Sequence, residues 1–166
     1  MQRFVVAMVL VALACGCGAH QSASTTVSST GVRVVMPRNW MVVRPAPDAP
    51  VIDPLTMLVV GTEGVRARSS QCQIAAYRVP AEGAVVVVVG WAGRGGSMKP
   101  GRAPLKTMTT VRKPELECFS GRGAAAQVRL RGKVYQVNVM VGDRASKRRV
   151  AEALAVARSF NVAGSD

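Results

Sequence analysis

Histidine and aromatic residues are scarce in this chain of 166 residues. The sequence contains one histidine, His20, and only 4% of its residues are aromatic. Ser-His-Asp and Cys-His hydrolases need a histidine beside the nucleophile, and His20 stands in a polar segment near the start of the chain. Single-strand-binding faces use several stacked aromatic side chains. The composition therefore disfavours these classes, and we identify no catalytic residue and no cofactor.

Acidic residues are also few. The chain has nine Asp and Glu residues and 22 Lys and Arg residues, which gives a formal net charge of +13. The basic residues are spread from Arg33 to Arg158 rather than gathered in one tail. Solvated surface charge explains this excess as well as a polyanionic partner in the cell envelope does, and both interpretations stay open. We predict no specific nucleic-acid ligand.

Cysteine is scarce as well: beyond Cys15 and Cys17 the chain has only Cys72 and Cys118. Two thiols in an exported chain most often pair, and closing a loop of roughly 46 residues would stabilise the fold by about 4 kcal/mol. A metal site or a reactive thiol is the alternative, but no C-x-x-C pair or nearby histidine accompanies these residues. We expect a disulfide between Cys72 and Cys118 and no metal site.

The first residues have the pattern of an export signal. Arg3 precedes an apolar run from Phe4 to Ala14, which is too short to cross about 30 Å of hydrocarbon as a stable helix. Residues 12–14 also fit an A-x-A cleavage site, which would release a secreted protein. We expect a signal peptide over residues 1–14.

The cysteine after this run suggests a lipid anchor. Residues 12–15, Ala-Leu-Ala-Cys, resemble the bacterial lipobox, although alanine stands where that motif favours leucine. The resemblance implies that Cys15, or alternatively Cys17, carries palmitate-type acyl chains and holds the protein on the extracytoplasmic side of a membrane. The segment up to Thr30 is small and polar, so we predict a disordered tether over residues 15–30 and a single domain over residues 31–166.

Strand patterns dominate the predicted domain. Residues 32–36 alternate and stop at Pro37, and residues 40–43 follow after a short turn, which predicts a β-hairpin. Five consecutive valines within residues 84–91 predict a central strand, because continuous apolarity requires burial on both faces. Further strands are predicted at residues 57–62, 71–79 and 108–111, and a second hairpin at 127–141.

A helix closes the predicted domain. Asp143 or Ser146 can cap it, and Val150, Leu154 and Ala157 recur at helical spacing up to about Arg158. Cations in its first turns oppose the helix dipole, so we expect them to have another role or to be solvated. The candidate anion-binding residues are those at the helix start and in the glycine-rich segment 90–104: Arg94, Lys99, Arg102, Arg144, Lys147 and Arg148.

Both ends of the domain resemble small envelope lipoproteins of GC-rich bacteria, a largely uncharacterised group. The resemblance rests on residues 36–40, Met-Pro-Arg-Asn-Trp, and on the segment from Val139 to Val162 with its Gly-x-x-Ala-Ser start of the helix. The resemblance implies architecture and location rather than an activity. The order of elements is also similar to the PsbP and Mog1 type of fold.

The sequence thus predicts an α+β domain: an antiparallel sheet with a C-terminal helix packed on one face. We expect an exported, membrane-anchored, non-enzymatic binding or accessory module of the cell envelope, whose partner is the membrane and an unknown envelope protein. Adhesion to envelope polyanions or anionic lipid is the first alternative. A small envelope hydrolase is the second, although no residue can be named for it.

Overall fold

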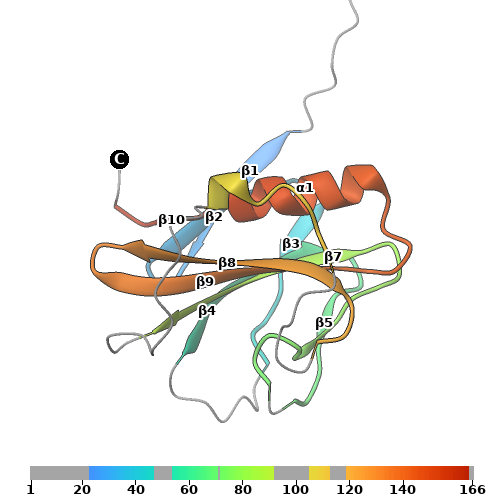
Figure 1. Ribbon diagram of the computed structural model, residues 1–166, viewed down its shortest axis with the longest axis horizontal. Helices are drawn as coiled ribbons and strands as arrows, with labels where there is room; N and C mark the ends of the chain where they lie inside the picture. The colour runs from blue at the N-terminus through green and yellow to red at the C-terminus, as the bar shows by residue number, and fades with distance from the viewer. Residues whose placement is uncertain (1–22, 47–53, 71, 92–104, 113–118, 165–166) are drawn as a thin grey trace, which may run out of the picture.

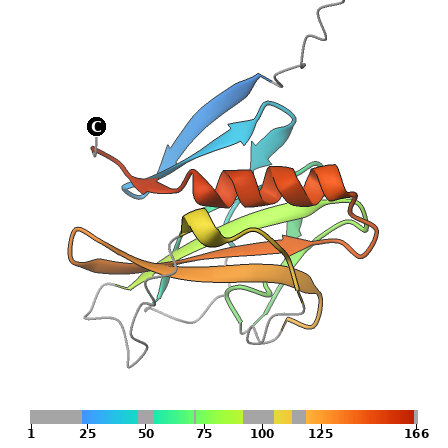
Figure 2. The same ribbon diagram turned by 45° about the horizontal axis from the view of Figure 1, so that its top comes forward.

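The computed structural model describes residues 23–46, 54–70, 72–91, 105–112 and 119–164. These residues form two antiparallel sheets, a short two-stranded ribbon and one long helix (Figure 1). The helix lies over one face of the larger sheet, beside the smaller sheet, and the ribbon lies beyond the other face (Figures 1 and 2). The predicted α+β class, with antiparallel sheet and a C-terminal helix packed on strands, is confirmed.

The larger sheet has five strands in the order β3-β4-β7-β9-β8. Its strands are β3 (Trp40–Val42), β4 (Leu55–Thr62), β7 (Ala84–Trp91), β8 (Arg122–Leu130) and β9 (Lys133–Val141). The valine-rich strand β7 is central as predicted, and Val85 to Val89 are all at most 1% exposed. Strands β8 and β9 form the predicted second hairpin, whose turn contains Arg131 and Gly132 at positive φ.

The smaller sheet has the order β1-β2-β10. It consists of β1 (Ser24–Ser29), β2 (Val32–Pro37) and the short closing strand β10 (Asn161–Val162). Strand β1 pairs with the whole of β2, from Ser24 opposite Pro37 to Ser29 opposite Val32. The prediction of a disordered tether was therefore wrong for residues 24–29. Polar Ser and Thr side chains suit an edge strand that faces solvent, and backbone pairing replaces the missing apolar burial.

The predicted hairpin over residues 32–43 does not form. Strand β2 pairs with β1, whereas β3 pairs with β4, so the chain passes from one sheet to the other at Arg38 and Asn39. Alternation and a turn signal identify two strands, but they do not determine which neighbour each strand bonds. We call residues Arg38, Asn39, Met41 and Val42 the corner.

Two other strand predictions were wrong in extent. Of the strand expected at residues 71–79, only β6 (Tyr77–Arg78) forms, paired with β5 (Arg66–Ala67) in the small ribbon. Residues 108–111 are not a strand but follow a short 3-10 helix, η1 (Leu105–Thr107), with a single bridge between Arg112 and Gly123. Both segments are short apolar runs, in which strand and irregular buried chain look alike in sequence.

Helix α1 (Lys147–Arg158) is close to its prediction, with Ser146 as its N-cap. The Ser146 hydroxyl accepts a hydrogen bond from the Arg149 backbone N–H at 3.1 Å, which satisfies one of the first-turn donors. At the other end the Ser159 hydroxyl accepts from the Val35 N–H at 2.8 Å. The helix is thereby attached to β2 as well as packed on the five-stranded sheet.

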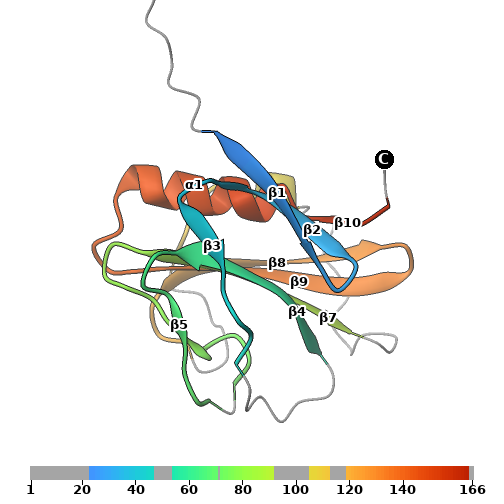
Figure 3. The same ribbon diagram turned by 180° about the vertical axis from the view of Figure 1, so that it is seen from behind.

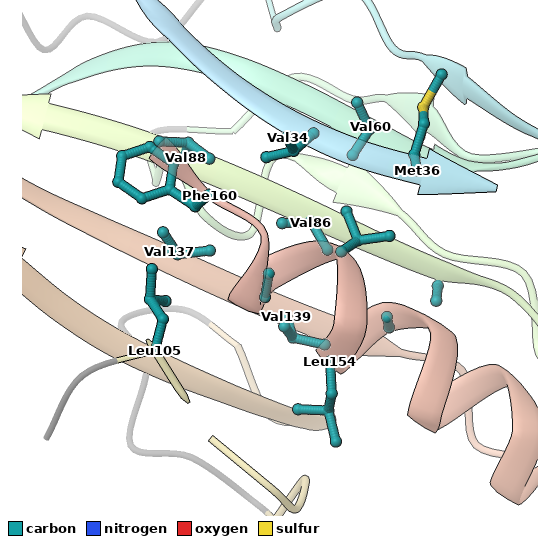
Figure 4. Close-up of a cluster of buried hydrophobic side chains, with 14 of the residues drawn as sticks. Val34, Met36, Val60, Val86, Val88, Leu105, Val137, Val139, Leu154 and Phe160 are labelled. Atoms are coloured by element: carbon teal, nitrogen blue, oxygen red, sulfur yellow. The ribbon is translucent and has the colours of Figure 1, made fainter. Parts of the chain in front are cut away.

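The main core lies between α1, β2 and the upper face of the five-stranded sheet (Figure 4). Valines from β2, β4, β7 and β9 pack there against Leu154 and Phe160. The centroids of the Phe160 and Tyr135 rings lie 5.4 Å apart. A second cluster on the opposite sheet face joins Val59, Val87 and Met140 to the ribbon through Tyr77. Trp40 is buried, as a core anchor should be.

Candidate binding surface

Three of the six candidate anion-binding residues are described, and all three are exposed. Arg144 precedes helix α1, and Lys147 and Arg148 stand in its first turn. Arg94, Lys99 and Arg102 lie outside the described residues, so whether the glycine-rich segment joins the helix start stays a prediction. The first turn of α1 contains no acidic residue.

Glu152 partly compensates the positive charge of the helix start. Its carboxylate accepts from Arg148 Nε at 3.1 Å and from the Arg149 guanidinium at 2.6 Å. The Arg148 side chain remains 80% exposed, whereas Glu152 is 19% exposed. Two guanidiniums therefore share one carboxylate, and the helix start keeps a positive excess that faces solvent.

A further cation, which no sequence pattern had indicated, lies at this place. Arg122 begins β8 opposite Val141, the last residue of β9, and its guanidinium donates to the Asp143 carbonyl oxygen at 3.2 Å. This contact brings Arg122 next to Arg144. Only the register of β8 on β9 places it there, because 21 residues separate Arg122 from Asp143 in sequence.

A second surface lies where the N-terminal segment enters the domain. The Ala23 carbonyl oxygen accepts from the Arg38 N–H at 3.1 Å, so the first described residue lies against the corner. Arg38 and Asn39 are exposed. Met41 is 44% exposed and Val42 55% exposed, two of the few large apolar side chains that reach solvent in the described chain.

The described carboxylates stand in turns or in the ion pairs already named. Glu63, Glu82 and Asp143 are exposed loop residues, and Glu152 pairs with the two arginines. No group of three His, Cys, Asp or Glu side chains that could hold a metal ion occurs among the residues described here. The other five carboxylates of the chain lie outside those residues: Asp48, Asp53, Glu115, Glu117 and Asp166.

Cys72 lies half-buried in the loop before β6, and its backbone N–H donates to the Ser70 hydroxyl at 3.1 Å. Its expected partner Cys118 lies outside the described residues, as do Cys15 and Cys17. The disulfide and the acylation therefore both stay predictions.

A chain of side-chain amides crosses the lower face of the larger sheet. Gln127 donates to Gln136 at 3.0 Å, Gln136 donates to Asn138 at 2.7 Å, and Asn138 donates to the Val87 carbonyl oxygen at 3.3 Å. Asn138 is fully buried and Gln136 is 9% exposed. The hydrogen bonds offset the cost of burying these groups among valines. These side-chain hydrogen bonds hold β9 to its neighbours β8 and β7, and we assign the three amides a structural role.

Burial also raises the pKa of the Tyr77 phenol above its usual 10.0, and a hydrogen bond from the Ala46 N–H partly opposes this rise. The charged phenolate is disfavoured because the apolar surroundings solvate it poorly. Tyr77 packs within the second core cluster, so its perturbed titration reflects a core position.

No helix in the described part of the chain is long and apolar enough to cross a membrane. Comparison of the chain with protein-family models, with curated proteins and with solved structures finds no match.

Proposed function

We propose that this protein is an exported lipoprotein, held on the extracytoplasmic side of a membrane by acyl chains on Cys15. Its domain acts there as a non-enzymatic binding or accessory module of the envelope. The likeness to the PsbP and Mog1 fold belongs to this proposal, and its support is the order of elements, strands followed by a closing helix.

The observation that carries the proposal is the short sequence distance between Cys15 and the first described strand. Strand β1 starts at Ser24 and Ala23 is already bonded to the corner, so only eight peptide units separate Cys15 from the domain. Eight residues span at most about 28 Å. An acylated Cys15 would thus keep the domain close to the bilayer, which suits a module that works at the membrane surface.

The decisive experiment is mass spectrometry of the mature N-terminus together with membrane fractionation. We expect acyl chains on Cys15 and sedimentation with membranes, because two or more chains bind a bilayer firmly whereas one binds marginally. A Cys15→Ser variant should be secreted or stay unprocessed, and a Cys17→Ser variant should still be acylated. An unmodified, cleaved N-terminus would refute the proposal.

A second candidate function is adhesion to envelope polyanions through the helix start. Arg122 favours it, since its contact with the carbonyl of Asp143, the residue before Arg144, adds a cation to the segment that leads into the helix. Retention on a polyanion column should then fall steeply with ionic strength. The variant Arg144→Ser/Lys147→Ser should elute earlier than wild type at low salt. Arg129→Ser/Lys133→Ser, at the β8–β9 turn on the side away from the helix start (Figure 1), serves as the control of equal charge. Equal elution of the two variants would refute this function.

A further inference from the structure

We propose that the corner is the surface by which the domain contacts the bilayer, and that its ligand is an anionic phospholipid surface. Arg38 would bind head-group phosphate. Met41 and Val42, which project to opposite sides of the edge strand β3, would both enter the interfacial layer along that edge. The inference rests on the proposed lipid anchor and adds to it the orientation of the domain.

The first argument is the position of the anchor relative to the fold. Ala23 is hydrogen-bonded to Arg38, so the first described residue, eight positions after Cys15, lies at the corner itself. A domain of about 140 residues is roughly 36 Å across, judged from its expected radius of gyration. A tether of at most about 28 Å cannot hold the opposite end of such a domain against the membrane. The inverted orientation, with only the opposite end on the bilayer, is therefore excluded, whereas the corner always stays within reach of the bilayer.

The opposite end is identifiable in the structure. Strand β2 runs from Val32 to Pro37, and its first residues lie beside β10 and the β8–β9 turn, where the Arg131 guanidinium donates to the Gly164 carbonyl. Figures 1 and 3 show this turn at the end of the domain away from the start of β1. Lys133, exposed at that turn, offers a matched cation that points away from the membrane when the corner faces it.

The second argument is the chemistry of the corner. An exposed arginine and two exposed apolar side chains stand within five residues, Arg38 just before the edge strand β3 and Met41 and Val42 on it. Surface Met and Val are disfavoured in water, and interfacial segments combine such apolar groups with Arg or Lys on the head-group side. Each cation near an anionic leaflet strengthens binding by about fivefold, a contribution that an anchored domain gains only on its membrane-facing side.

Hydrogen exchange of the acylated, full-length mature protein on vesicles tests this orientation. We compare vesicles of phosphatidylglycerol and phosphatidylcholine with detergent micelles, and follow peptides that cover residues 38–43 and 130–134. Exchange of the corner peptide should slow by at least about threefold on the anionic vesicles, because docking excludes water from the edge strand, while the turn peptide is unchanged.

Two charge reversals of equal size complete the test. Arg38→Glu should lose most of the corner protection, whereas Lys133→Glu should retain it, and circular dichroism verifies that both are folded. Met41→Ser should weaken the protection without any change of charge. The proposal is overturned if the acylated wild-type protein shows no corner protection, or if both reversals lower it equally. Protection that rises with protein concentration in micelles would also overturn it, since a second copy would then cover the corner. Absence of acyl chains on Cys15, seen in the same mass spectra, would refute the anchor instead.

Discussion

Gly142 is the position at which a single added methyl group should damage this fold most clearly. A Cβ atom there would lie 2.1 Å from the Pro80 carbonyl oxygen and 2.3 Å from that of Ala81. Both are backbone atoms of the turn that precedes β7, so no side-chain rotation can relieve the overlap. The Gly142→Ala change must therefore push the end of β9 away from this turn.

The loss of stability can be worked out from the backbone hydrogen bonds that this displacement would break. The Gly142 N–H donates to the Gly83 carbonyl at 3.0 Å, and the Arg144 N–H donates to the Ala81 carbonyl at 2.8 Å. Each bond contributes about 1 kcal/mol, and overpacking adds about 1–3 kcal/mol. Alanine also lowers the conformational entropy of the unfolded chain, which offsets roughly 0.5 kcal/mol of this loss of stability. We expect the free energy of unfolding to fall by about 3 kcal/mol.

Urea unfolding followed by far-UV circular dichroism measures this loss, provided that the m-value stays constant. The matched control is Gly132→Ala in the β8–β9 turn. Gly132 has φ +76° but nothing within 4 Å of an added Cβ, so this variant should lose only about 1 kcal/mol through left-handed strain. If Gly142→Ala is no more destabilising than Gly132→Ala, the close approach of the two backbones is not what requires glycine here.

Three further predictions concern stability. Asn138→Leu should lower the free energy of unfolding by about 1–3 kcal/mol in urea titration, because Gln136 loses its acceptor inside the sheet; a neutral effect would contradict the amide chain. Burial raises the pKa of Tyr77 in the folded state above the 10.0 of the unfolded chain. Below pH 10.0 the free energy of unfolding should therefore not depend on this group. Above that pH it should fall by about 1.4 kcal/mol per pH unit until the folded-state pKa is passed. Tyr77→Phe should remove that part of the alkaline slope, and an unchanged slope would exclude the assignment. Cys72 and Cys118 should resist thiol labelling in native oxidised protein, and reduction should lower the stability by up to about 4 kcal/mol; labelling of both would end the disulfide prediction.

Local pattern determined much of the fold. The valine run could only be a doubly buried strand, since β-branched side chains favour extended backbone and no polar face was left for solvent. Ser146 and the spacing of Leu154 and Ala157 were enough to locate α1, because capping and helical periodicity act within a few residues. Gly132 likewise indicated the turn of the β8–β9 hairpin. The structure places that turn at Arg131 and Gly132, one residue before the expected Gly132 and Lys133, and both turn residues have positive φ.

Pairing between distant segments was decided only in the tertiary structure. The local sequence does not distinguish a polar edge strand from a polar tether. Strand β1 is recognised only in the structure, where it pairs with β2 along its whole length. The same holds for the corner, where adjacent strands that looked like a hairpin separate into two sheets. Arg122 joins the helix start, and Arg38 joins the entry of the N-terminal segment, through backbone contacts between residues far apart in sequence. The sequence thus specified which residues carry charge and which segments form strands. Strand partners and register depend instead on which apolar surfaces bury one another, and they bring the charged residues together on particular surfaces.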